Sequence, residues 1–416
     1  MTSRRTLVLA ASAALAALCG GLAARTSDAG GAPNLGAVLR VNPMVDQAER
    51  LLEGLPWHPD VIRADLAVQG PVALTAIYVM REDLIAVDAA GKLFCLSRRD
   101  LTPRWVSTLR HPLSAPPAEG PLHYVFVEKD TRGASWIQAL SKRSGAESDR
   151  SPIRLAFSAS SGVSATATTA YVGSYGSPVD NKTMESVDLT KGSIGWGFRT
   201  AGRVTGPPTV DLQGESLIVV SEDMSVTALK ADSASAHSAS ILWEAKTLGR
   251  NMCSPTLTKD LAFLGSDDNF LRCFDVHSGT VRWMKGVDAP IRKSPWLLGN
   301  VVSREVESAG PGSPKVIVES FEGMVFVKNA IGLHAFDAAT GEEIFHDANA
   351  ERPLVKVGDW VVTLDGAKNA QFRKGPGGKV AQPTPMGMFE FLPTNQRDGV
   401  LVAGFADGTV LLAVPK

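Results

Sequence analysis

Short runs of alternating apolar and polar residues, separated by turn residues, fill most of this chain, and the clearest example lies at residues 265–283. A polar Asp-Asp-Asn turn at residues 267–269 follows an apolar run. Residues 270–274 then alternate large apolar side chains with other residues, and a His-Ser-Gly turn at 277–279 precedes a segment that carries Trp283. Period-two alternation between tight turns predicts a pair of β-strands.

The same arrangement recurs with constant spacing. An aspartate is followed by a glycine four residues on and by an aromatic residue four beyond that. The aspartate can cap the amides of its own turn, and glycine adopts positive φ at no steric cost. In-register copies of this kind indicate a tandem array. The corresponding positions are Ser186, Asp188, Lys191, Gly192 and Trp196; Cys273, Asp275, Ser278, Gly279 and Trp283; and Ala335, Asp337, Thr340, Gly341 and Phe345.

The repeat unit spans roughly 40–50 residues, the length of a four-stranded propeller blade. Trp105, Trp196, Trp243 and Trp283 recur at about that interval or twice it. We therefore predict an all-β β-propeller of eight four-stranded blades. Seven blades also fit, because the second repeat carries weak markers. The expected repeats are 66–107, 108–155, 156–199, 200–246, 247–286, 287–348, 349–385 and the remainder to Lys416.

Two features interrupt the regular array. The sixth repeat contains an insertion around residues 307–315 that is too rich in Gly and Pro to form a strand. The eighth repeat ends without a fourth strand of its own. Because an open sheet edge invites wrong pairing, we predict that an N-terminal strand from before residue 66 closes the ring, with residues 36–41 (GAVLRV) as the candidate.

These turns and strands resemble the repeat of PQQ-type β-propellers, whose signature is A-x-D-x-x-T-G-x-x-x-W. The copy at 335–345 matches it except for Phe345 in place of Trp. The copy at 273–283 departs at Cys273 and Ser278, and the copy at 186–196 departs at Ser186 and Lys191. The resemblance implies the fold of residues 66–416. It implies little about function, because many non-enzymes share the repeat.

The N-terminal residues 1–26 are predicted to be a signal peptide. Arg4 and Arg5 precede an apolar run from Leu7 to Leu18 that is too short to span a bilayer. The segment also resembles a twin-arginine signal, so both export routes stay open. Cys19 is a candidate lipid anchor, although Leu18 stands where lipoprotein signals have a small residue; the alternative is a cysteine lost on cleavage.

Residues 27–65 are predicted to form a linker with one short helix. Their first part is small and polar, and apolar positions from Val45 to Leu55 then follow a helical spacing that Pro56 ends. After the signal no apolar run reaches membrane length, so we expect no membrane span. The net charge of −1 without a basic run argues against nucleic-acid binding.

The repeated tryptophans have two interpretations, a ligand platform or packing between blades. Recurrence once per unit favours packing. Three cysteines remain after the signal, Cys95, Cys253 and Cys273. The odd number, and the intervening strand between the last two, favour buried free thiols over disulfides. The cysteines and histidines have no zinc-site spacing.

The resemblance also implies one enzymatic hypothesis, a quinoprotein dehydrogenase that holds PQQ and Ca²⁺ in the central channel. Such enzymes carry adjacent paired cysteines and long insertions over the site, which this sequence lacks. Asp267 and Asp268 are candidate calcium ligands, but turn capping is the favoured interpretation. The seven histidines, His58 and His277 among them, fall in no hydrolase motif. We therefore expect no catalytic residue, cofactor or metal.

The overall organisation resembles the BamB-like outer-membrane assembly lipoproteins, which have an export or lipid signal and eight such blades. This resemblance implies a non-catalytic, exported, monomeric scaffold in the periplasm or cell envelope. Its expected partners are other proteins of the envelope, because strand-joining loops form two binding faces on a rigid disc. The alternative is the PQQ- and calcium-dependent dehydrogenase.

Overall fold

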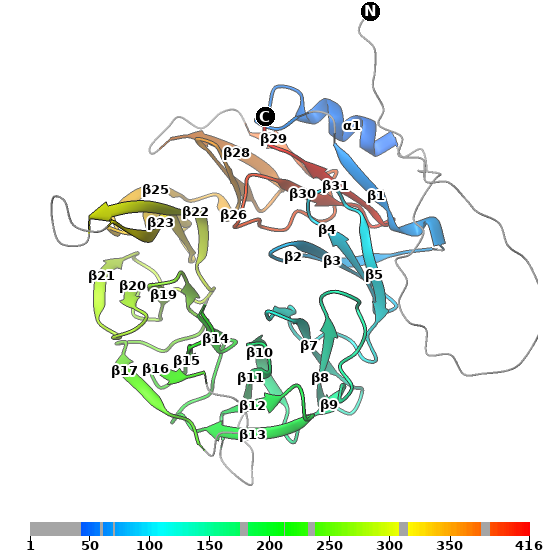
Figure 1. Ribbon diagram of the computed structural model, residues 1–416. Coiled ribbons are helices and arrows are strands. Elements are labelled where there is room, and N and C mark those ends of the chain that lie inside the picture. The colour runs from blue at the N-terminus through cyan, green and yellow to red at the C-terminus, as the bar shows by residue number, and fades with distance from the viewer. Residues whose placement is uncertain are drawn as a thin grey trace, which may run out of the picture.

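Eight antiparallel sheets stand around a central axis and form a closed ring (Figure 1). The computed structural model describes residues 43–58, 61–69, 71–174, 182–211, 213–231, 238–307, 315–375 and 383–416. Within seven of the sheets four strands follow one another in chain order from the axis to the rim. The prediction of an all-β propeller with eight blades is confirmed, and the second repeat is a complete blade.

The first four blades contain sixteen strands in chain order. Their bounds are, for the first blade, β2 (Leu74–Val79), β3 (Asp83–Asp88), β4 (Lys92–Ser97) and β5 (Pro103–Thr108); for the second, β6 (Ala118–Glu119), β7 (His123–Lys129), β8 (Ser135–Ser141) and β9 (Ile153–Arg154); for the third, β10 (Ala159–Ala165), β11 (Thr169–Ser174), β12 (Met184–Asp188) and β13 (Ser193–Phe198); and for the fourth, β14 (Thr209–Val210), β15 (Ser216–Val220), β16 (Ser225–Lys230) and β17 (Ile241–Lys246).

The next three blades keep the same order. The fifth contains β18 (Thr256–Leu257), β19 (Leu261–Gly265), β20 (Phe270–Asp275) and β21 (Val281–Gly286); the sixth contains β22 (Trp296–Glu307), β23 (Lys315–Lys328), β24 (Leu333–Asp337) and β25 (Glu343–Asp347); and the seventh contains β26 (Ala350–Val357), β27 (Trp360–Asp365), β28 (Asn369–Lys374) and β29 (Thr384–Pro385).

The eighth blade joins the two ends of the described chain. Its sheet has the order β1 (Ile62–Asp65), β31 (Thr409–Ala413) and β30 (Leu401–Gly404), and a bridge from Phe391 to Gly404 extends it toward the axis. An N-terminal strand thus closes the ring, as predicted, but it is β1; the candidate segment 36–41 lies outside the described residues. Ile62 pairs with Leu412 and Asp65 with Thr409, a register that the sequence pattern alone did not predict.

Helix α1 (Pro43–Leu52) and Trp57 cover this last blade. The helix buries Val45, Ala48 and Leu52 against the seventh and eighth blades, and Trp57 lies in the same apolar cluster. The helix ends three residues before the predicted Leu55, where Gly54 adopts φ +82°. A short 3₁₀ turn, η1 (Leu66–Gln69), follows β1. None of the described helices is long and apolar enough to cross a membrane.

Blade-to-blade packing places the apolar core in a series of clusters between neighbouring sheets. Trp105 is fully buried, and its Nε1 donates to the carbonyl of Lys142 in the next blade at 2.9 Å. Trp243 and Trp283 donate in the same way to Val276 (2.7 Å) and Ala338 (3.1 Å). The packing interpretation of the tryptophan row is therefore confirmed.

The repeat turns behave as the sequence predicts. The Asp275 carboxylate accepts the amides of His277 and Ser278, and Asp337 does the same for its own turn. Gly279 has φ +70°, and a Cβ built there would lie 2.5 Å from the Trp243 ring. Glycine is thus required twice, for the backbone conformation and for the approach of the neighbouring tryptophan.

The three cysteines in the ring are buried free thiols, as predicted. Cys253 lies in the cluster between the fourth and fifth blades, whereas Cys273 lies in the cluster between the fifth and sixth. They occupy opposite faces of one sheet, and burial raises the pKa of both thiols to about 12. Both are therefore protonated, unreactive parts of the core at neutral pH.

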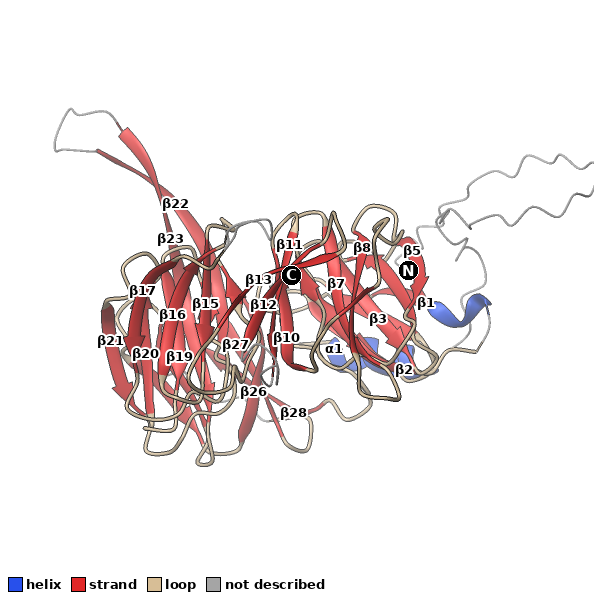
Figure 2. Ribbon diagram, turned by 90° about the horizontal axis from the view of Figure 1, so that it is seen from below, coloured by secondary structure: helices blue, strands red, loops and turns tan. Residues whose placement is uncertain are grey.

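The insertion in the sixth repeat lengthens two strands. β22 and β23 pair without interruption from Trp296 opposite Phe326 to Glu307 opposite Lys315, and this hairpin arm projects beyond the disc (Figure 2). Glu307 and Lys315, which the prediction placed in a strand-free insertion, are therefore strand residues. Residues 308–314 lie outside the described residues. The arm belongs to the face on which the first and second strands of every blade are joined.

Candidate functional site

The turns between the first and second strands of the blades converge on one mouth of the central channel. Two adjoining cavities lie there, of about 950 and 830 Å³, and they share Arg81, Gln213 and Arg397 as lining residues. A third cavity of about 330 Å³ is also lined by Arg397. We call this region the channel mouth.

Basic side chains dominate the lining of the largest cavity. They come from the first, second and eighth blades, so they are far apart in the sequence and meet only because the ring closes. The cavity is lined by five basic residues and three acidic residues: Arg81, Arg104, Lys142, Arg143 and Arg397, and Glu82, Glu119 and Asp211. The channel mouth therefore carries an excess of positive charge.

Glu119 lies at the centre of this group and is shared by several donors. Its carboxylate lies 2.6 Å from Lys142 Nζ and accepts the Arg81 amide at 2.7 Å. Arg397 approaches the same carboxylate at 3.6 Å. One negative charge thus serves two cationic side chains and a backbone donor.

A second carboxylate, that of the buried Asp83, fixes the position of Arg104. Asp83 is fully buried, lies 2.9 Å from Arg104 Nε and accepts a 2.6 Å hydrogen bond from the Tyr124 hydroxyl. Burial and then the Asp83 hydrogen bond raise the pKa of Tyr124, so its hydroxyl stays a donor. Lys142 lies 5.2 Å above the Tyr124 ring. The basic side chains are therefore held in place by buried partners.

A segment inside the ring carries Arg397, which lines all three cavities. Residues 392–398 run along the inner strand of the seventh blade, where Asn395 forms a parallel bridge with Val355. Gln396 reaches the sixth blade and accepts the Leu297 amide at 2.8 Å. Sequence analysis missed this segment, whose only signal was the long connection between the last strand of the seventh repeat and the apolar run of the eighth.

Electrostatics at Arg397 reflect its crowded surroundings. Loss of water around the guanidinium lowers the pKa of Arg397; Arg81 and Arg98 reinforce this, and Glu119 and Asp398 oppose it. The side chain is still 41 % exposed, and an arginine stays charged at neutral pH. Arg397 is thus a partly dehydrated cation that lies between two other arginines and two carboxylates.

The base of the hairpin arm forms the other wall of the channel mouth. The second cavity is lined there by Leu297, Val301 and Phe321, together with Asn300 and Ser320. Val301 is 58 % exposed. The channel mouth therefore combines a basic side with a partly apolar side.

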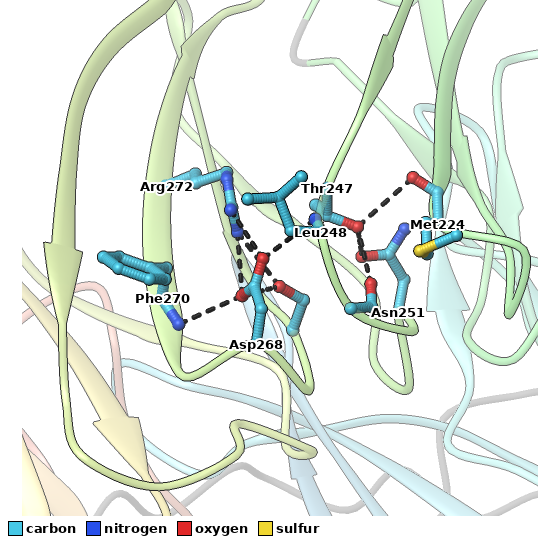
Figure 3. A network of polar contacts seen from close by, with 9 residues as sticks. Met224, Thr247, Leu248, Asn251, Asp268, Phe270 and Arg272 are labelled. Atoms are coloured by element: carbon cyan, nitrogen blue, oxygen red, sulfur yellow. Dashed lines mark hydrogen bonds and ion pairs between the residues drawn. The ribbon is translucent and has the colours of Figure 1, made fainter.

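The aspartates considered as calcium ligands lie at the opposite face, in the turn between β19 and β20. Asp268 pairs with Arg272 at 2.5 Å and accepts the amides of Phe270 and Leu248 (Figure 3). Asp267 pairs with two arginines, Arg250 at 3.2 Å and Arg292 at 2.7 Å. Asp268 thus caps its own turn, as the favoured interpretation predicts, whereas Asp267 is held by ion pairs with two arginines.

Asp268 also fixes the backbone at Leu248, an apolar residue whose side chain is exposed to solvent. Leu248 is 81 % exposed, and its amide is fixed by Asp268 (Figure 3). Next to it, Thr247 Oγ1 contacts Asn251 and the Met224 carbonyl. Burial opposes ionisation of Asp268, but hydrogen bonds from Arg272 and Ser266 lower its pKa to about 2.

The histidines are mostly dispersed, as the sequence suggests, with one exception. His334 and His346 stack at 4.3 Å between ring centres, and His334 Nδ1 lies 2.9 Å from Glu343. His58 and His277 lie elsewhere, at the seam and in a repeat turn. Within the described residues no three His, Cys, Asp or Glu side chains are grouped so that they could hold a metal ion.

The residues at the channel mouth do not fit a calcium-bound quinone. Ca²⁺ requires about six to eight oxygen ligands, whereas the carboxylates in the largest cavity are outnumbered by basic side chains. Of these carboxylates, Glu119 is engaged by Lys142 and Arg397, and Asp211 accepts the amides of Glu215 and Ser216. This donor set repels a divalent cation.

Comparisons with known proteins agree with the fold. A family model described as outer membrane protein assembly factor BamB matches residues 127–363. The crystal structure of BamB from Moraxella catarrhalis is similar with a TM-score of 0.57 and 17% identity, over 85% of this chain and 96% of that chain. The computationally designed Ika8 protein is similar with a TM-score of 0.54 and 12% identity, over 83% and 96%. The sequence matches no curated protein.

Proposed function

Because this chain belongs to the family of the outer membrane protein assembly factor BamB, we propose that it is a non-catalytic scaffold that binds other proteins of the cell envelope during outer-membrane protein assembly. The observation that carries the proposal is the family match, which runs from the second to the seventh blade of one continuous ring. Such a ring presents loops on two faces and needs no catalytic group to bind a protein.

The chemistry of the channel mouth supports a binding role over the dehydrogenase alternative. Its basic side chains are anchored by Asp83, Glu119 and Tyr124, an arrangement that holds charge in fixed positions. Fixed charges favour specific association with a complementary surface. They do not favour the calcium ion that the quinone enzyme requires.

Export would place the scaffold beside its partners. We propose that residues 1–26 direct the chain out of the cytoplasm and that the mature protein acts in the periplasm, free or anchored through Cys19. Mass spectrometry of the mature N-terminus distinguishes the two forms. A lipid on Cys19 that disappears in Cys19→Ala supports the anchor, and a mature chain that begins after Cys19 contradicts it.

Crosslinking in intact cells tests the scaffold role. A tagged protein is crosslinked, purified from the envelope and compared with the untagged protein from the same cells. We expect outer-membrane assembly proteins to be recovered in stoichiometric amounts with the tagged chain. Recovery of the chain alone contradicts the proposal, and PQQ retained through dialysis in the presence of Ca²⁺ would favour the enzyme instead.

A further inference from the structure

The channel mouth leaves positive charge without an equal number of carboxylates. Five basic residues line the largest cavity against three acidic ones, although one of the five, Arg104, is paired with the buried Asp83; the second cavity adds Lys259 against Asp260. Two of the acidic side chains are already committed, since Glu119 contacts Lys142 and Arg397 and Asp211 caps its own turn. Cations in a recess attract anions strongly because low-dielectric walls focus the field.

Charges of both signs surround Arg397. Arg81 and Arg98 oppose its charge, whereas Glu119 and Asp398 favour it; Arg98 is itself paired with Asp398 at 3.0 Å, and the Arg397 guanidinium is partly removed from water. An added carboxylate would relieve this repulsion and form charge-assisted hydrogen bonds with planar guanidinium groups. A carboxylate is thus a suitable partner for the guanidinium groups of Arg81 and Arg397.

The size of the recess favours a chain segment over a small anion. The cavities of about 950 and 830 Å³ adjoin through Arg81, Gln213 and Arg397. Sites for drug-sized ligands typically reach about 300–1,000 Å³, so each cavity alone has that size. The arm base adds Val301, 58 % exposed, and Phe321 along one side. A ligand that fills both cavities therefore combines several negative charges with apolar side chains.

We propose that the channel mouth binds an extended acidic peptide segment of a partner protein, with Arg81, Arg143 and Arg397 holding its carboxylates and the base of the hairpin arm contacting its apolar side chains. The inference rests on the proposed scaffold function and names the chemistry of the partner.

Binding of a labelled peptide tests the inference. The probe is a fluorescent peptide of about eight alternating glutamate and valine residues, and its control has glutamine in place of glutamate. We expect the acidic peptide to bind by fluorescence anisotropy and the control to bind at least about 10-fold more weakly. Raising the salt from about 50 to 300 mM should weaken the acidic peptide further, because partly exposed charges are screened.

Charge reversal locates the site. Arg397→Glu should weaken the acidic peptide at least about 10-fold, since it replaces attraction by repulsion. Arg143→Glu is a second variant at an exposed position, so its fold is expected to survive. The matched control is Arg250→Glu, which breaks an ion pair of a 59 % exposed arginine at the opposite face. Melting temperatures identify any variant that fails to fold.

The outcomes separate this inference from the proposed function. Equal binding of the glutamate and glutamine peptides, or unchanged binding by folded Arg397→Glu and Arg143→Glu, overturns the acidic-peptide site. Full displacement of the peptide by equimolar citrate also overturns it, in favour of a small-anion site. If these variants still recover the envelope partners after crosslinking, the scaffold function stands without the site. If the peptide binds but no envelope protein is recovered, the site stands and the scaffold function fails.

Discussion

The junction between the fifth and sixth blades and the seam in the eighth blade hold one ring together by different means. At the junction, Trp283 donates to the Ala338 carbonyl and packs against Gly341, so the contact lies within neighbouring repeats. At the seam, β1 pairs with β31 from the other end of the chain, and Trp57 donates to the Gly399 carbonyl at 2.7 Å. Repeats therefore stabilise each other locally, whereas closure depends on one long-range pairing.

The largest effect is expected from removal of the seam. A chain that begins after Asp65 loses β1, the fully buried Trp57 and the apolar face of α1. We expect its free energy of unfolding to fall by at least about 5 kcal/mol, more than the loss of a single buried aromatic residue. Thermal unfolding of the shortened chain measures this. A melting temperature equal to that of the full chain would show that β1 does not close the ring.

Replacing a tryptophan between blades should have the next largest effect. Trp105→Ala is expected to cost about 5 kcal/mol and Trp283→Ala about 3 kcal/mol, because Trp105 is fully buried whereas Trp283 is half-buried. Denaturant unfolding compares the two variants. Trp105→Phe serves as the control, since it keeps an aromatic ring but loses the hydrogen bond to Lys142. Equal stability of Trp105→Ala and the unchanged protein would restore the platform interpretation.

The glycine beneath Trp283 offers a smaller and more specific test. A Cβ at Gly341 would lie 2.6 Å from the Trp283 ring, at φ +71°. Gly341→Ala should therefore cost about 2–4 kcal/mol through crowding and backbone strain. Gly358→Ala is the matched control, because Gly358 has φ +53° but nothing within 4 Å of the added atom. Its cost should stay near 1 kcal/mol, and equal costs would mean that the tryptophan contact contributes nothing.

The smallest expected effect is a loss of stability at acidic pH. Burial opposes ionisation of Asp275, but hydrogen bonds from Arg282 and Ser278 lower its pKa to about 2, and Asp268 behaves similarly. An unfolded aspartate titrates near about 3.9. The stabilisation from these carboxylates is therefore complete above about pH 4 and is lost as the pH falls toward 2. Melting temperatures between those values should fall less steeply in Asp268→Asn, and an identical slope would contradict the assignment.

Much of the fold could be predicted because the residues that define each repeat lie close together in the sequence. The Asp275 and Gly279 turn, the following strand and the anchoring Trp283 lie within a few residues of each other, and their spacing recurs. The spacing predicted eight blades and their approximate boundaries, with seven left as an alternative because the second repeat carries weak markers. The closing segment was identified only by its location before residue 66, since pairing between chain ends leaves no local periodicity to follow.

The candidate site was not predictable in the same way. Arg81, Glu119, Lys142 and Arg397 belong to three blades, and each occurs in an ordinary polar turn or strand end. The contacts of Glu119 with Lys142 and Arg397, and the repulsion between Arg81 and Arg397, exist only after the ring has brought these segments to the channel mouth. Likewise, the Gly- and Pro-rich insertion gave no sign that its flanking strands extend into a projecting arm (Figure 2).

The sequence by itself thus determined the repeating unit and its turns, and limited the ring to seven or eight blades, because backbone conformation and side-chain alternation act over short distances. The tertiary structure decided the register of β1 on β31, the course of residues 392–398 inside the ring and the charge gathered around Arg397. Each of these joins residues that are distant along the chain, and such contacts form only when the closed ring fixes the relative positions of all its blades.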